Sequence, residues 1–277
     1  MWIDSHCHLD AQAFDSDRIA VIDRAKKNNI SMLVIPAVAS SNFSKVQTLA
    51  RSYGFAYALG IHPWYVEDSV SSDLDLLEQS LNQAKTDPHL VAVGEIGLDY
   101  CFAKHNRDKQ MQWYCAQLQL ARRFNLPVIL HVRRSADELL KGLNQYPAVS
   151  GIAHAFNGSL AQAKRFIDKE IYLGFGGTLT YERALQIRRL AQNVCANHLV
   201  LETDSPDMPP KWLYQTNKNH SGLGPQKPSV SRNEPAELVR IAKSLCELRN
   251  WNLQEAAHQT RLNSIRALPK LMQLMPI

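Results

Sequence analysis

The stretch VAVGEIG at residues 91–97 is apolar almost throughout, and its hydrophobic residues do not alternate with polar ones. Such a pattern is typical of a parallel β-strand that is covered on both faces. Most of seven further runs share this character, and gaps long enough for a helix separate them: MWID at 1–4, SMLVIPAV at 31–38, AYALGIHP at 56–63, PVILHV at 127–132, SGIAHAF at 150–156, IYLGFGG at 171–177 and LVLETDS at 199–205.

The segments between these runs carry helix signals. QMQWYCAQLQLARRF at 110–124 places four residues on one stripe at helical spacing, namely Met111, Tyr114, Cys115 and Leu118. SLAQAKRFI at 159–167 opens with a serine, which favours a helix N-cap. Eight strand–helix alternations predict an α/β fold, a single (β/α)8 TIM barrel that forms one domain over residues 1–277. A doubly wound open sheet is the alternative.

Composition limits the class of protein. No run approaches the roughly 20 apolar residues of a membrane-spanning helix, so we expect no membrane association. The first residues, MWIDSHCH, lack the basic start and apolar run of a signal peptide. The five cysteines form no CxxC pair, which indicates reduced thiols and a cytoplasmic location. The net charge of +5 permits an anionic substrate but does not require one.

Side chains suited to metal binding stand where these apolar runs end. In a (β/α)8 barrel the carboxyl ends of the strands meet on one face, where such enzymes carry out their chemistry. The side chains are His6 and His8 after the first run, His62 in the third, Glu95 in the fourth, His131 in the fifth, His154 in the sixth, and Glu202 and Asp204 in the eighth.

The segment WIDSHCHLD at 2–10 places two of these histidines one residue apart. If the strand continues through it, His6 and His8 point to the same face and Cys7 points away. An isolated pair of this kind could also be two unrelated surface histidines. The other residues at the strand ends decide for a metal site, because imidazole and carboxylate ligands together suit borderline divalent ions.

The number of these residues fits two ions. We expect His6, His8 and Asp204 to hold one ion, and His131 and His154 to hold the second. Glu95 would bridge both ions through its two oxygens. The cofactors predicted are therefore two divalent ions per chain, Zn²⁺, Mg²⁺ or Mn²⁺. Such a pair is typical of enzymes that hydrolyse phosphate esters or amides.

The motifs DSHCHLD, GIHPW, VGEIGLDY, LPVILHVRR, HAFNG and LETDSP, with NEP at 233–235, resemble the TatD family of metal-dependent deoxyribonucleases, within the amidohydrolase-like barrel group. The resemblance spans nearly the whole chain in the family's order. It implies a divalent-metal hydrolase that acts on ester bonds, with ligands at His6, His8, Glu95, His131, His154 and Asp204. Asparagine stands in the polar position of HAFNG, at Asn157.

We expect Asp204 and Glu95 to be the catalytic residues, with Asp204 also accepting a proton from the attacking water. The alternative for Asp204 is a turn or N-cap role. His62, Arg133 and Asn157 are the predicted substrate contacts. His62 could instead be a turn residue before Pro63, and Arg133 could form a surface ion pair. Asp99 is expected to shape a loop or to support the site from behind, and Glu202 to be structural or to lie behind the ligands.

The longest irregular stretch, residues 206–235, contains cations interleaved with aromatic residues: Lys211, Trp212, Tyr214, Lys218, Lys227 and Arg232. This pattern suits single-stranded nucleic acid, because cations follow the backbone and bases stack on rings. The alternative is an ordinary polar loop.

These observations predict a phosphodiesterase of the exonuclease type, whose substrate is DNA, single-stranded or frayed at its end. We expect no obligate protein partner. The first alternative is a small-molecule amide or lactone hydrolase on the same barrel. The second is a non-catalytic metal-binding or partner-binding scaffold, against which the complete ligand set argues.

Overall fold

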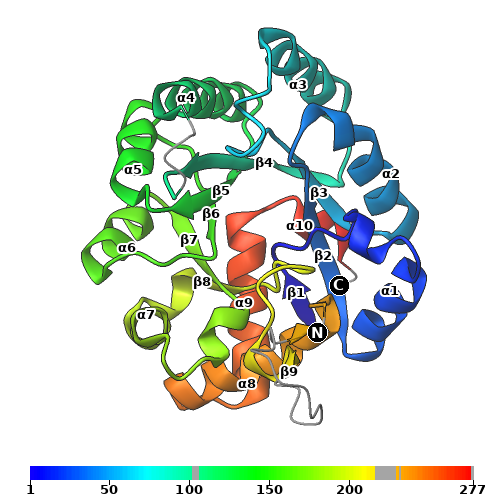
Figure 1. The fold of residues 1–277 in the computed structure, drawn as a ribbon, viewed down its shortest axis with the longest axis vertical. Coiled ribbons are helices and arrows are strands. Elements are labelled where there is room, and N and C mark those ends of the chain that lie inside the picture. Colours follow the sequence, from blue (N-terminus) through cyan, green and yellow to red (C-terminus); the bar gives the residue numbers. More distant parts are fainter. Residues whose placement is uncertain (102–105, 216–228, 231, 276–277) are drawn as a thin grey trace, which may run out of the picture.

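A computed structural model of the chain describes residues 1–101, 106–215, 229–230 and 232–275. Its main feature is one sheet of eight parallel strands in sequence order (Figure 1). The eight runs predicted from the sequence supply these strands: β1 (Trp2–Asp4), β2 (Ile30–Pro36), β3 (Ala56–Leu59), β4 (Leu90–Asp99), β5 (Val128–Arg133), β6 (Gly151–His154), β7 (Ile171–Phe175) and β8 (Leu199–Leu201).

The first and last strands lie side by side, which excludes the open sheet and confirms the barrel. The backbone N–H of Ser5 donates to the carbonyl of Leu201 at 3.1 Å, and the N–H of Asp204 donates to the carbonyl of His6 at 2.9 Å. The buried Asp4 carboxylate adds a third link, because it accepts the N–H of Thr203 at 2.9 Å. The barrel therefore closes where two of the predicted ligand-bearing segments meet.

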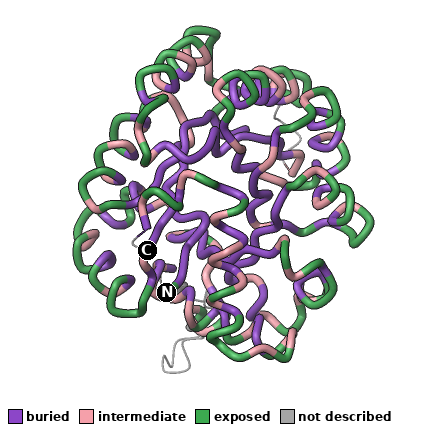
Figure 2. Tube along the Cα trace, turned by 180° about the vertical axis from the view of Figure 1, so that it is seen from behind, coloured by how far each residue is buried: buried purple, intermediate pink, exposed green. Residues whose placement is uncertain are grey.

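Helices surround the strands (Figure 1). Figure 2 shows that the strands are buried and that the helices turn exposed residues outward. The α-helices are α1 (Arg18–Lys27), α2 (Phe43–Tyr53), α3 (Ser71–Gln83), α4 (Arg107–Arg123), α5 (Ala136–Gln145), α6 (Leu160–Ile167), α7 (Leu185–Asn193), α8 (Leu238–Arg249), α9 (Leu253–Ala267) and α10 (Leu271–Leu274). Short 3₁₀ helices are η1 (Gln12–Phe14), η2 (Ser40–Asn42), η3 (Gly177–Thr180), η4 (Ala196–His198), η5 (Lys211–Leu213) and η6 (Pro235–Glu237).

Helix α9 packs against β1 and β8, beside the line where the barrel closes. The buried Asn263 of α9 donates its amide to the carbonyls of Ala196 and Leu199, at 2.7 Å each. These hydrogen bonds fix the start of β8, whose far end leads into Asp204. In the part of the chain that the structure describes, no helix combines the length and the apolar character needed to cross a membrane.

Helix α4 confirms the predicted helix but not its whole buried stripe. Tyr114 and Leu118 are buried as expected, whereas Met111 and Cys115 are only partly buried. Two glutamines of α4 are buried as well. Gln117 accepts the N–H of Ile61 at 2.7 Å and donates to its carbonyl at 3.1 Å, and Gln110 makes the same pair of bonds with Asp99 at 2.9 and 3.3 Å. Hydrophobic spacing misses these glutamines because they pair with backbone groups rather than with apolar side chains.

The N-cap predicted for α6 is confirmed. The Ser159 hydroxyl accepts the N–H of Gln162 at 3.1 Å, and the Gln162 side chain in turn accepts the N–H of Ser159 at 2.8 Å. This reciprocal pair satisfies two of the N–H groups that every helix start leaves without partners.

Candidate metal centre

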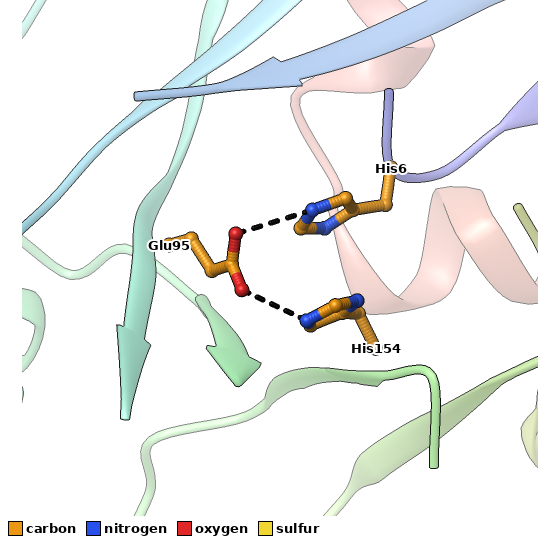
Figure 3. Close-up of side chains that lie close together, drawn as sticks. All are labelled: His6, Glu95 and His154. Atoms are coloured by element: carbon orange, nitrogen blue, oxygen red, sulfur yellow. Dashed lines mark ion pairs between the residues drawn. The ribbon is translucent and has the colours of Figure 1, made fainter. Parts of the chain in front are cut away.

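Glu95 lies at the centre of the barrel mouth, and its two carboxylate oxygens face different histidines (Figure 3). Oε2 lies 3.3 Å from Nε2 of His6, and Oε1 lies 2.8 Å from Nε2 of His154. The side chain is almost fully buried, at 2 % exposure. A buried carboxylate with each oxygen directed at a separate set of donors is well placed to bridge two cations.

The first cluster consists of Nε2 of His6, Nε2 of His8, Oδ1 of Asp204 and Oε2 of Glu95. The two imidazole nitrogens lie 3.2 Å apart, and each lies 3.3–3.5 Å from the two carboxylate oxygens. An ion with tetrahedral bonds of about 2.0–2.1 Å separates its donors by about 3.3 Å. The spacing of the first cluster therefore fits one ion of this size.

The second cluster consists of Nδ1 of His131, Nε2 of His154 and Oε1 of Glu95. These three atoms lie 2.8–3.2 Å from one another. His62 stands at the edge of this cluster, with Nε2 3.1 Å from Nδ1 of His131 and 3.4 Å from Oε1 of Glu95. Burial lowers the pKa of His62 to about 4, so the ring is neutral at neutral pH.

The expected strand geometry around the first histidines is wrong. Strand β1 ends at Asp4, so His6 and His8 lie in the irregular segment that follows it. Their rings still converge, because the backbone after β8 holds this segment in place: Asp204 donates to the carbonyl of His6, and His8 donates to the carbonyl of Ser205 at 2.9 Å. Cys7 does point away from the cluster, and its sulfur contacts the Ser205 hydroxyl at 3.2 Å.

Asp204 has an unusual backbone conformation. Its φ of 54° lies in the left-handed region, which aspartate tolerates better than most residues. The N–H of Asp207 donates to its carbonyl at 2.9 Å, so the predicted turn is present. The turn and the cluster use different atoms of the same residue, because the side-chain oxygen Oδ1 points toward His6 and His8.

Asp99 orients His131 from behind, a role that the sequence analysis left open. Its Oδ2 lies 3.1 Å from Nε2 of His131 and accepts the indole N–H of Trp64 at 2.6 Å. A carboxylate can only accept, so Asp99 keeps a proton on Nε2 of His131; an ion in the second cluster would then take the lone pair of Nδ1, which faces Oε1 of Glu95 at 2.9 Å. Carboxylate–histidine pairs of this kind commonly orient metal-binding rings.

Glu202 lies behind His154 and contributes no atom to either cluster. Its Oε1 accepts the N–H of Ala155 and lies 3.8 Å from Nδ1 of His154. The small residues of GFGG make room for this carboxylate, because a Cβ atom on Gly174 would overlap Oε2 of Glu202. Glu202 therefore occupies part of the space that these glycines leave at the end of β7.

The site attracts positive charge. Burial alone would raise the pKa of Glu95, but the neighbouring histidines, His154 foremost, hold it well below its usual range. Burial opposes protonation of His8, yet Glu95 and Asp204 raise its pKa to about 9. Burial also raises the pKa of Asp204. The carboxylates that make His8 this basic also favour cations, and divalent ions compete with protons for the same lone pairs.

A cavity of about 1050 Å³ opens above both clusters. All three predicted substrate contacts line it, namely His62, Arg133 and Asn157. Arg133 is half-exposed and lies 3.6 Å from Oδ2 of the buried Asp99, so it combines an ion pair, although not a surface one, with a place at the pocket. Two aromatic residues also line the cavity and are about half exposed, Trp64 at 47 % and Tyr65 at 46 %.

The described part of the loop favours the plain polar interpretation. Lys211 forms an ion pair with Glu182 at 2.8 Å, and Arg232 forms one with Asp17 at 2.7 Å. The indole N–H of Trp212 donates to Glu237 at 2.7 Å. Two short strands, β9 (Tyr214–Gln215) and β10 (Ser229–Val230), pair antiparallel, so the stretch is not wholly irregular. Lys218 and Lys227 lie outside the described residues.

Comparison with known proteins places this geometry among metal-dependent hydrolases. The sequence model of a family described as TatD related DNase matches residues 3–269. The uncharacterized metal-dependent hydrolase YjjV of Escherichia coli is 38% identical over 270 residues, which cover 96% of this chain and 97% of that protein. The crystal structure of YjjV, a TatD homologue, matches with a TM-score of 0.86 at 35% identity and covers 97% of this chain and 98% of that one.

Two further relatives are named for an activity. Deoxyribonuclease TATDN3 of Homo sapiens is 31% identical over 285 residues, covering 99% of this chain and 96% of that protein. The 3'-5' ssDNA/RNA exonuclease TatD of Shigella flexneri is 29% identical over 254 residues, covering 90% and 91%.

Proposed function

Because this chain belongs to the TatD family of metal-dependent hydrolases, we propose that it hydrolyses phosphodiester bonds at the ends of single-stranded nucleic acid. The observation that carries the proposal is the Glu95 carboxylate, set between two donor clusters at the floor of a large cavity. Two ions in such an arrangement form the clamp used to displace groups at phosphorus.

The proposed ligands follow the two clusters. His6, His8 and Asp204 would hold one ion, His131 and His154 the other, and Glu95 both. Four of these six ligands are imidazoles, which favours Zn²⁺ over Mn²⁺ and Mg²⁺, ions that prefer oxygen. When bound, such ions lower the pKa of water and offset the negative charge of the phosphodiester.

The protein's own side chains supply the remaining functions. Asp204 would accept a proton from the attacking water, because its carboxylate borders the cavity and burial raises its pKa toward that of a useful base. Arg133 and Asn157 would contact the phosphate backbone from the cavity wall. Asp99 would keep the ring of His131 in its ligating orientation.

The rim of the cavity supports a substrate with unpaired bases. The half-exposed rings of Trp64 and Tyr65 offer faces on which a base can stack, and stacking needs a base that is free of a duplex. Their position in the cavity wall, close to His62 on the side of the second cluster, replaces the 206–235 loop as the basis for single-strand preference. The name of the Shigella flexneri relative, an ssDNA/RNA exonuclease, is in keeping with this proposal.

Tyr65 tests the stacking proposal. Tyr65→Leu should weaken binding of a single-stranded oligonucleotide by about 5- to 100-fold, because a stacked base contributes about 1–3 kcal/mol. Tyr65→Phe keeps the ring and should bind within about 2-fold of the parent. Fluorescence anisotropy with a labelled oligonucleotide measures both. Equal affinities for the two variants would remove Tyr65 from the binding surface.

The two adjacent histidines test the first ion. Replacing His6 and His8 together with alanine should remove one of two bound ions, because the first cluster then keeps only carboxylate oxygens. Metal analysis of dialysed protein gives the count, and circular dichroism checks that the barrel has folded. A double variant that still holds both ions would contradict the assignment of the first cluster.

The activity itself is tested with end-labelled substrates. Metal-stripped protein reloaded with Zn²⁺, Mn²⁺ or Mg²⁺ is incubated with single- and double-stranded oligonucleotides, labelled at either end. We expect stepwise shortening of the single strand that depends on added metal. A parallel panel of amides and lactones tests the alternative substrate class, and hydrolysis there without any cleavage of oligonucleotides would overturn the proposal.

A further inference from the structure

The position of His62 is compatible with two opposite roles. Its Nε2 lies within 3.4 Å of two second-cluster donors, Nδ1 of His131 and Oε1 of Glu95. This spacing would suit a fourth ligand of the second ion, and together with Glu95 and His131 the ring could hold a cation. The same position would also suit a hydrogen-bond donor that faces whatever enters the cavity.

The other ring nitrogen of His62 decides between these roles. The backbone N–H of Trp64 donates to Nδ1 of His62 at 3.1 Å. Nδ1 must therefore present a lone pair, which excludes both the protonated ring and the tautomer with hydrogen on Nδ1. In the remaining tautomer the hydrogen is on Nε2. An Nε2–H group has no lone pair to offer a metal ion.

His131 shows the opposite arrangement two strands away, on β5. Its Nε2 faces the carboxylate of Asp99, so the hydrogen is on Nε2 and the lone pair of Nδ1 is directed at the second cluster. The His62 and His131 ring centroids lie 4.3 Å apart, and Nε2 of His62 lies 3.1 Å from Nδ1 of His131, whose lone pair is reserved for the ion. The hydrogen-bond partners of the two rings therefore suit His131 to be a ligand and His62 to be a hydrogen-bond donor.

The fold holds His62 in this tautomer. Its backbone N–H donates to Val38 at 2.9 Å, and its carbonyl accepts the N–H of Tyr65 at 2.9 Å in the turn that also presents the N–H of Trp64. The side chain is 5 % exposed. Turning the ring to offer a lone pair from Nε2 would leave the Trp64 N–H without this acceptor in a nearly closed site.

We propose that His62 is a neutral hydrogen-bond donor to a phosphate oxygen of the substrate and not a ligand of the second ion. This inference rests on the proposed function, because it takes a phosphodiester as the group that enters the cavity. A fixed N–H aimed at the reacting group gains strength as negative charge builds on phosphate oxygens in the transition state. His62 would thus bind the phosphate and accelerate its cleavage.

Two nearly isosteric variants separate donor from ligand. His62→Gln keeps an N–H donor near Nε2 but removes the imidazole, whereas His62→Glu keeps a possible ligand atom and removes the donor. The donor role predicts two ions per chain in both variants, with turnover within about 10-fold of the parent for glutamine and a further fall for glutamate. A ligand role predicts a different metal content: the glutamine variant should lose one ion, and the glutamate variant should keep two.

His62→Leu adds a readout that needs no nuclease activity. Metal content is measured by mass spectrometry, and binding of inorganic phosphate to the metal-loaded protein is measured by calorimetry. We expect two ions, and phosphate affinity lower by about 10- to 100-fold, the usual effect of one hydrogen bond to a charged group. Unchanged phosphate affinity, or the loss of one ion from the leucine variant, would overturn the inference. If oligonucleotides are not cleaved but phosphate binding still depends on His62, the proposed substrate fails and this inference stands.

Discussion

Replacing Asp204 with asparagine is expected to lower turnover on an oligonucleotide by about 10²–10⁴-fold, the usual contribution of a general base. Asparagine keeps the size of the side chain and an oxygen near His6 and His8, but it cannot accept the proton of the attacking water. The second cluster, which does not include Asp204, should keep its ion. Substrate affinity should change much less than turnover, because the metals and nearby cations hold the phosphate.

The turn at Asp204 makes a separate prediction for the same variant. If Asp204 served only the turn, whose hydrogen bond uses its backbone carbonyl, asparagine would cost about 1 kcal/mol of stability at most and turnover would stay near normal. Steady-state kinetics at saturating metal, metal content and melting temperature therefore distinguish the two roles. Turnover within a few-fold of the parent would remove Asp204 from the mechanism.

The second large effect is expected for Glu95→Gln. The amide offers one oxygen where the carboxylate offers two, so one of the two clusters loses its shared donor. We expect the metal content to fall from two ions to about one. Turnover should fall by more than about 100-fold. That is the largest usual effect of removing a residue that only hydrogen-bonds to a metal ligand, whereas Glu95 would be a ligand itself.

Glu202→Gln is the matched control for this substitution. It makes the same substitution at a second buried carboxyl group of the barrel mouth, which contributes no atom to either cluster and whose pKa burial raises to about 8. The two variants are therefore compared above pH 8, where both carboxyl groups of the parent are ionised. The control should keep both ions. Loss of an ion from both variants to the same extent would indicate a general effect of charge at the barrel mouth and would contradict the bridging role of Glu95.

Much of this account could be predicted from the sequence, because two simple physical rules cover it. Buried parallel strands form continuous apolar runs, so all eight strands could be located. In a barrel the carboxyl ends of these strands converge, so residues as distant in sequence as His6 and Asp204 could be expected at one place. The structure brings together all six residues proposed as ligands.

What the sequence does not show are contacts that depend on the orientation of individual side chains. Asp99 lies two residues beyond the predicted strand 91–97, and only the structure shows that β4 reaches it and that its side chain turns toward His131 and Trp64. The tautomer of His62 depends on one N–H two residues further along the chain. Arg232 looks like a cation for nucleic acid until its ion pair with Asp17 on the neighbouring segment is known. Spacing alone carries none of this information.

The central claim is that Glu95 bridges two ions, and anomalous diffraction tests it most directly. Crystals of the metal-loaded protein are measured on either side of the absorption edge of Zn²⁺ or Mn²⁺. We predict two anomalous peaks about 3.5–4 Å apart, one among His6, His8 and Asp204, the other beside His131 and His154, with the Glu95 carboxylate between them. A single peak at saturating metal, or two peaks that the Glu95 carboxylate does not join, would contradict the account.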